Sequence, residues 1–232
     1  MGSRGRGSGT GKSTVTADQQ RAIDKIAKQT RDLKNEQYRI VGEDGQVKAV
    51  SKGQKHEVGT TVGEKRDKVP GSVTIHNHPS GGTFSSADFS DFGYGARAIY
   101  AAAPEGTYSL ANTKYGKKDA KAGWVAMREA YENSEAGRER GFMELKKAAT
   151  STARYQKAAK AAETAAQRYM QARNAGKPQA TLDKLMATYN TASQRQSAIY
   201  KEELRNAEVR PAHEWLKANA KKYGFKYSFT RR

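Results

Sequence analysis

The hydrophobic pattern of the chain switches between a helix-like and a strand-like period, and these switches constrain the fold more than any other feature. From Glu36 to residue 112 the apolar residues come in short alternating or β-branched runs separated by turn sequences, a pattern typical of strands. From about 118 to 207 the chain is rich in Ala, Glu, Lys, Arg and Gln, which favour helix. The strand-like runs are EQYRIV, QVKAV, SVTIHNH, ARAIYAAA and TYSLAN, and FKYSF near the C-terminus is a sixth.

We therefore predict an α/β fold of the α+β type, in which a mixed β-sheet is flanked by helices. A first helix begins after a cap at Thr16 or Asp18. The sequence NAGKP at 174–178 ends one long helix and starts another, so the helical region is expected to form a long antiparallel, coiled-coil-like hairpin. Its seam is weak, because Gln196 lies near an expected apolar position.

The same patterns divide the chain into four segments. Residues 1–15 are rich in Gly, Ser and Arg and are expected to be a flexible basic tail. Residues 16–117 form the sheet-containing core, and residues 118–207 form the helical hairpin as an insertion. Residues 208–232 return to the core as a helix and a last strand.

Composition narrows the classes of function. The 232 residues include no cysteine, which excludes disulfides, a thiolate nucleophile and a thiolate metal site. No run approaches the roughly 20 apolar residues that cross a bilayer, and no secretory signal is evident, so we expect no membrane partner and a cytoplasmic protein. The net charge of +18 suits an anionic partner such as nucleic acid, and equally a solvated surface.

The segment IHNHPSGGTFSSADF holds the candidate chemistry. Side chains two residues apart on a strand share a face, so His76 and His78 are expected to converge. The Pro-Ser-Gly-Gly turn brings the next helix back, which allows Asp88 to join them. Two imidazoles and a carboxylate suit Zn²⁺ and leave a fourth position for water, as in catalytic zinc sites.

This segment resembles the signature of the JAMM (JAB/MPN) metallopeptidase family, in which an upstream Glu is followed by H-x-H-P and S-x-x-D. His76, His78, Ser85 and Asp88 match it, and HNHPSG also resembles the RadC branch and the JAB domains of phages and other mobile elements. The resemblance implies a cytidine-deaminase-like JAB/MPN core, zinc on the two histidines and Asp88, and a Ser85 that stabilises the tetrahedral intermediate. Six residues separate His78 from Ser85 where seven are common; Ser86 restores that spacing but breaks S-x-x-D.

The resemblance also implies a glutamate at the start of an early strand, which acts as general base and acid on the zinc-bound water. Glu36, directly before QYRIV, matches this position best. Glu43 at the following hairpin turn and Glu57 in the turn-rich stretch beyond it are alternatives.

Two functional hypotheses follow. The first is a zinc-dependent metallopeptidase or isopeptidase that cleaves an amide bond of a protein or peptide substrate, with a ubiquitin-like conjugate as the class that the resemblance implies. The same site hydrolysing a phosphodiester is a close variant. The alternative is a non-enzymatic or nuclease-like module of this fold that binds nucleic acid or a partner protein through its basic helical arm.

Overall fold

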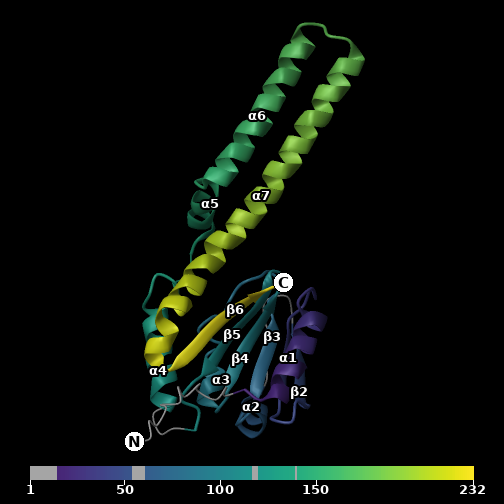
Figure 1. Cartoon of the computed structure of the whole chain (residues 1–232). Coiled ribbons are helices and arrows are strands. Elements are labelled where there is room, and N and C mark those ends of the chain that lie inside the picture. The colour runs from purple at the N-terminus through teal and green to yellow at the C-terminus, as the bar shows by residue number, and fades with distance from the viewer. Residues whose placement is uncertain (1–14, 54–60, 117–119, 139) are drawn as a thin grey trace, which may run out of the picture. The chain divides into compact units, whose positions relative to one another are not determined.

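The structure, a computed structural model, describes residues 15–53, 61–116, 120–138 and 140–232 (Figure 1). The chain forms two compact units. The first, called the sheet unit, consists of Met1–Gly137 and Ala212–Arg232. The second, called the hairpin unit, is Arg138–Pro211.

The sheet unit is built on a six-stranded sheet of order β2-β1-β3-β4-β5-β6. β3 and β4 are parallel, and the other neighbouring strands are antiparallel. The predicted α+β fold with a mixed sheet is therefore confirmed, and each of the strand-like runs forms a strand. The bounds are β1 Gln37–Val41, β2 Val47–Lys52, β3 Val73–Asn77, β4 Ala98–Ala103, β5 Gly106–Asn112 and β6 Phe225–Arg231.

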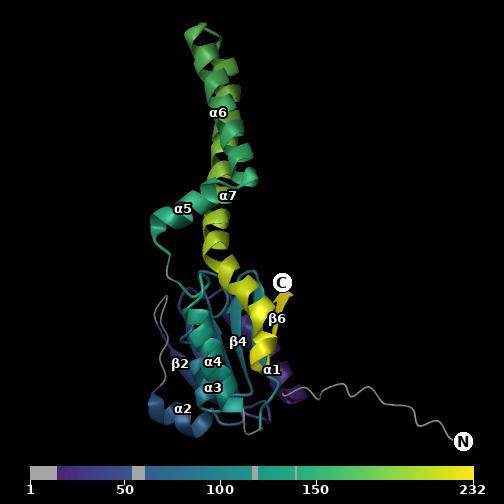
Figure 2. The same cartoon turned by 90° about the vertical axis from the view of Figure 1, so that its left-hand side faces the viewer.

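Helices of the sheet unit cover both faces of its sheet (Figure 2). On one face, α1 buries Ile23 and Ile26 in a cluster with Ile75 of β3. On the other face, α3, α4, the last part of α7 and a 3₁₀ helix contribute to a larger apolar cluster that includes Phe89, Met127 and Leu216, among others. The bounds are α1 Ala17–Thr30, α3 Ser90–Gly93, α4 Ala120–Glu132, α7 Gln179–Asn219 and η1 Ala220–Tyr223.

Local sequence signals account for the first elements. Thr16 caps α1, and its hydroxyl accepts from the backbone N–H of Gln19 while the Gln19 side chain accepts from the backbone of Thr16, which confirms Thr16 over Asp18 as the cap. The turn between β1 and β2 contains Gly45 with a φ of +77°, a conformation that glycine adopts without strain. The stretch expected to be turns contains a short helix, α2 (Val62–Lys68), which Thr61 caps.

The hairpin unit consists of α5 (Phe142–Thr150), α6 (Ala153–Asn174) and most of α7. α6 ends in a Schellman motif, in which the N–H of Lys177 donates to Ala172 O at 3.1 Å and Gly176 takes a positive φ of +62°. The NAGKP sequence thus separates two helices, as predicted.

Two features of the helical region differ from the sequence-based expectation. α4, which the prediction assigned to the 118–207 insertion, lies in the sheet unit, because Met127 and Tyr131 are buried in the apolar core there. The helix expected within residues 208–232 is not a separate one but a continuation of α7, which runs through Pro211 to Asn219. Among the residues that the structure describes, no helix is both long and apolar enough to span a bilayer.

Candidate metal centre

β3 delivers the two histidines at its C-terminal end. Because side chains alternate along a strand, the burial of Val73 and Ile75 beneath α1 turns Thr74 and His76 toward the opposite face. His78 follows one residue after the strand, and its backbone N–H still bonds to Ala102 O of β4 at 2.9 Å. The alternation therefore continues, and His78 shares a face with His76.

The loop after β3 returns the chain so that Asp88 reaches both histidines. Gly81 and Gly82 take φ values of +83° and +118°, which a residue with a β-carbon adopts only with strain. The turn that ends near Ser85 is fixed by the Asp88 carboxylate, whose Oδ2 accepts from the Ser85 N–H at 2.7 Å and the Ser85 hydroxyl at 2.9 Å. This leaves Oδ1 of Asp88 directed toward His76.

The three predicted ligands come together. The Nε2 atoms of His76 and His78 are 2.6 Å apart, and Asp88 Oδ1 lies 3.2 Å from His76 Nε2. One ligand atom of each residue lies within 4.8 Å of the others. His78 Nδ1 donates to Gly82 O at 3.3 Å, so the Nε2 lone pair of that ring is the one that faces the other two donors.

The surroundings set the charge state that metal ligands need. Burial and the neighbouring His76 lower the pKa of the His78 imidazole to about 4, so this ring is neutral at pH 7. Burial raises the pKa of Asp88, but the two histidines and the hydrogen bonds from Ser85 outweigh it and hold the pKa below its usual value. A neutral imidazole and an ionised carboxylate are the forms that bind a cation.

Glu36 lies at the same end of the sheet as these ligands. It directly precedes β1, whose ladder with β3 pairs Tyr38 with His76. Beyond this pair the Gln37 N–H donates to the Asn77 side chain at 2.7 Å, and the Glu36 backbone oxygen accepts from the Gly53 N–H at 2.9 Å. Glu36 is partly buried there.

The two alternative glutamates differ in position. Glu43 lies two residues beyond the opposite end of β1, in the turn that leads to β2. Its carboxylate forms an ion pair with Arg97, and its backbone oxygen accepts from the Thr16 hydroxyl at 2.8 Å. Glu57 lies outside the described residues.

Sequence reasoning missed a buried polar cluster beside the ligands. Asp91 of α3 accepts from Lys65 Nζ at 2.8 Å, from the Thr74 hydroxyl at 2.7 Å and from the Tyr38 hydroxyl at 2.9 Å. Burial raises the pKa of Tyr38 well above its ordinary value, and the charge of Asp91 adds to this. Tyr38 lies opposite His76 in the ladder between β1 and β3, so the cluster helps to fix the position of the strand that carries His76.

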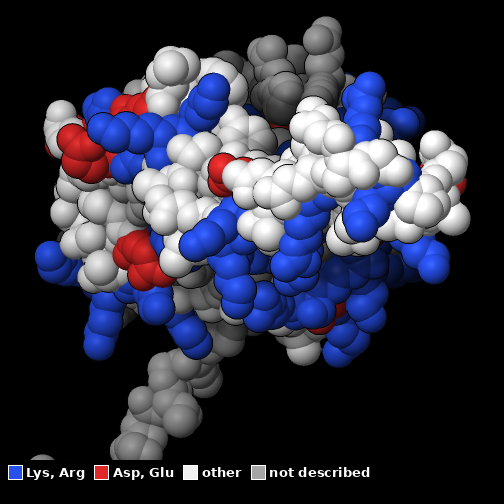
Figure 3. Space-filling model, turned by 90° about the horizontal axis from the view of Figure 1, so that it is seen from above, with Lys and Arg blue, Asp and Glu red and all other residues white. Residues whose placement is uncertain are grey.

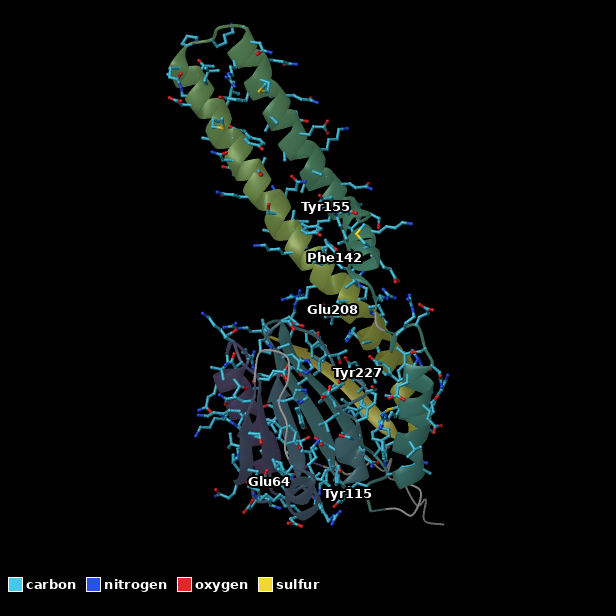
Figure 4. All side chains as sticks on the ribbon, turned by 180° about the vertical axis from the view of Figure 1, so that it is seen from behind. Glu64, Tyr115, Phe142, Tyr155, Glu208 and Tyr227 are labelled. Carbon is cyan, nitrogen blue, oxygen red and sulfur yellow. The ribbon has the colours of Figure 1, made fainter. Side chains whose placement is uncertain are left out.

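Two further contacts that the sequence did not predict hold the loop between the ligands. Glu105, in the turn between β4 and β5, accepts from the Gly82 N–H at 3.0 Å. The Thr83 hydroxyl is 2.9 Å from the hydroxyl of Tyr227 on β6, a residue labelled in Figure 4. The Tyr227 hydroxyl in turn lies 2.8 Å from Nδ1 of His213. Both contacts come from one side of β3, because β4, β5 and β6 follow it in the order of the sheet.

Comparison with protein-family models, with curated proteins and with solved structures finds no match. The interpretation of the site consequently depends on the geometry of the residues themselves and on the motif in which they occur.

Proposed function

We propose that His76, His78 and Asp88 hold a zinc ion and that the chain is a zinc-dependent hydrolase of amide bonds, with a core of the JAB/MPN type. The observation that carries the proposal is the convergence of two imidazole nitrogens and a carboxylate oxygen within 4.8 Å. Each ligand is oriented by a second group, since His78 bonds to Gly82 O and Asp88 bonds to Ser85.

The donor set fits the metal. Two histidines and one carboxylate are a common ligand set of catalytic zinc, and donors at about 2.0–2.1 Å from a tetrahedral ion lie about 3.3 Å from each other. The distances of 2.6 Å and 3.2 Å within the group need only small side-chain movements to reach that value. Zinc with three protein ligands keeps one position for water and lowers the pKa of that water to about 7.

The residues around the ligands supply the remaining chemistry. Glu36, directly before β1, accepts the proton of the attacking water and passes it to the leaving amine. Ser85 orients Asp88 through the hydrogen bond between its hydroxyl and Oδ2, and its predicted contact with an oxyanion remains part of the proposal. Protein or peptide substrates, with isopeptide bonds to a ubiquitin-like modifier first among them, follow from the resemblance of the motif.

Zinc content tests the proposal directly. We expect the full chain, purified without chelator and dialysed, to contain about one zinc per chain by plasma mass spectrometry. His76→Ala and Asp88→Asn should each lose it, whereas Asp183→Asn, which changes an exposed carboxylate of the hairpin unit, should keep it. A wild-type chain that neither contains nor takes up stoichiometric zinc would overturn the proposal and leave a binding module of the same fold.

A further inference from the structure

The hairpin unit contains an open groove along the seam of α6 and α7. A cavity of about 980 Å³ lies toward the start of α6, and one of about 470 Å³ continues it toward the hairpin tip. Ala161, Thr188 and Ala192 line both, so the two cavities are parts of one groove.

The groove stays open because the residues along it are too small to fill the space between the helices. Its floor is made mainly of alanine, including exposed Ala161 and Ala187. Elsewhere along the seam the side chains are large. Tyr155, labelled in Figure 4, packs on Tyr200 with ring centroids 5.9 Å apart, and Gln196 donates to the Tyr155 hydroxyl at 3.2 Å.

The hairpin unit also has little core of its own. The buried apolar residues among its described part are four alanines and one isoleucine: Ala149, Ala158, Ala162, Ala165 and Ile199. Two packed helices with so small an apolar contact are marginal in water, since most helical stability comes from tertiary packing of an apolar face. A third apolar surface in the groove would add the missing burial.

Positive charges border this apolar floor on both helices. Lys157, Lys160 and Arg168 of α6 and Arg195 of α7 line the groove and are exposed. No ion pair involves these four side chains within the described part of the chain, whereas Arg154 at the groove's end bonds to Glu202 at 2.6 Å. Over the whole chain Lys and Arg outnumber Asp and Glu by 42 to 24, and the view from above in Figure 3 shows this excess.

We propose that the groove between α6 and α7 binds an acidic amphipathic helix of a partner protein, which completes a three-helix bundle. Large apolar side chains of that helix fill the spaces over the alanines, and carboxylates on its flanks pair with the basic rim. The lining of α6 extends from Arg154 to Arg168, about 21 Å of helix, so the bound segment is about 14–16 residues long.

The positive charge and the apolar floor of the groove together favour an acidic helix over a second copy of the chain or a nucleic acid. A second copy of the chain would bring one basic groove against another, because residues 138–211 contain 15 Lys and Arg against 7 Asp and Glu. A nucleic-acid backbone would neutralise the rim but would leave the alanine floor without an apolar partner. Of these three occupants, the acidic helix is the one that pairs with the basic rim and also covers the apolar floor.

Fluorescence anisotropy with the full chain tests the proposal. The probe is a fluorescein-labelled 16-residue synthetic helix with leucines on one face and glutamates on its flanks. We expect it to bind at least about tenfold more tightly than a peptide of the same composition in scrambled order, and to weaken as salt is raised. A 20-base-pair DNA duplex and a peptide with lysine in place of glutamate serve as the competing ligands.

Matched variants locate the binding to the groove. Ala161→Trp fills the floor and Arg195→Glu reverses the rim, and each is expected to weaken binding of the acidic peptide about tenfold or more. Gln167→Trp on α6 and Lys201→Glu on α7, both exposed and outside the groove, are expected to leave it within about twofold. Circular dichroism of each variant verifies that the helices are intact.

Two outcomes overturn the proposal. One is equal binding of the ordered and scrambled acidic peptides, because the apolar floor would then not recognise a helix with its leucines on one face. The other is tighter binding of the DNA duplex that Arg195→Glu abolishes, which would make the groove a nucleic-acid site. Neither outcome depends on the zinc content of the chain, so this test and that of the metal centre fail independently.

Discussion

At the scale of single residues, the glutamates before and after β1 are a natural matched pair. Glu36 lies at the histidine end and Glu43 at the other, where it pairs with Arg97. We predict that Glu36→Gln keeps zinc and lowers kcat for amide hydrolysis about 10²–10⁴-fold, because an amide cannot accept the proton of the attacking water. Glu43→Gln should keep both zinc and activity.

Zinc content and turnover of a fluorogenic isopeptide substrate, measured on the same preparations, check this pair. Loss of zinc in Glu36→Gln would make Glu36 a ligand instead of a base. Loss of activity in Glu43→Gln alone would move the role of the base to the other end of β1.

Asp91 provides a second residue-scale prediction, about stability. Its buried carboxylate accepts from Lys65, Thr74 and Tyr38, so Asp91→Ala leaves a cation and two hydroxyls without their acceptor. We expect the free energy of unfolding to fall by about 3–5 kcal/mol in urea.

The surface pair between Glu64 and Lys68, at 3.2 Å, is the control for Asp91. Both side chains are about 40% exposed, and Glu64→Gln is expected to cost less than about 0.5 kcal/mol. If the free energy of unfolding fell by similar amounts in the two variants, the Asp91 cluster would contribute no more to stability than a surface ion pair.

At the scale of elements, local patterns in the sequence predicted the strands and helices well. The alternation of side chains along a strand was enough to predict that His76 and His78 share a face, and the capping sequence predicted where α1 begins. Asp88 was predicted as the third ligand from the S-x-x-D motif. In the structure a loop with two glycines of positive φ brings it to the histidines. Such features are local, which is why a single sequence reveals them.

Long-range packing was harder to predict. Asp91 lies between Phe89 and Phe92, and an acidic residue within so apolar a turn was a signal of a buried partner that the sequence analysis did not use. Its partners Lys65 and Thr74 come from other elements, and no local pattern names them. The assignment of α4 to the sheet unit has the same cause, because only its tertiary contacts decide it.

Pro211 inside α7 yields a prediction for that helix. A proline lacks the N–H that would bond to the carbonyl four residues earlier, here Ala207. The guanidinium of Arg140 donates to this oxygen at 3.5 Å and partly replaces the missing bond. We predict that Pro211→Ala raises the free energy of unfolding by about 1–3 kcal/mol, measured by far-ultraviolet circular dichroism.

A double-mutant cycle separates the two contributions to this helix. Arg140→Gln should destabilise the wild-type chain more than it destabilises Pro211→Ala, where the carbonyl of Ala207 has its own backbone donor. Additive effects in the cycle would show that Arg140 does not compensate for the proline.

At the scale of the whole molecule, the two units differ in what holds them together. Apart from the four alanines and one isoleucine buried in the hairpin unit, the buried apolar side chains belong to the sheet unit, within the described part of the chain. The candidate zinc ligands also lie in the sheet unit. A ligand that binds only the folded form of one unit stabilises that unit by mass action.

The two tryptophans make this difference measurable. Trp124 and Trp215 both lie in the sheet unit, whereas α5, α6 and most of α7 give the hairpin unit a strong helical signal. We predict that thermal unfolding followed by tryptophan fluorescence and by ellipticity at 222 nm gives two midpoints, the ellipticity change beginning at the lower temperature.

Zinc at about 100 times its Kd should stabilise the fluorescence transition by about 2.7 kcal/mol and leave the early ellipticity change in place. Asp88→Asn should remove the zinc effect without merging the two transitions, whereas coincident transitions that zinc shifts together would show that the continuous helix α7 makes the two units unfold as one.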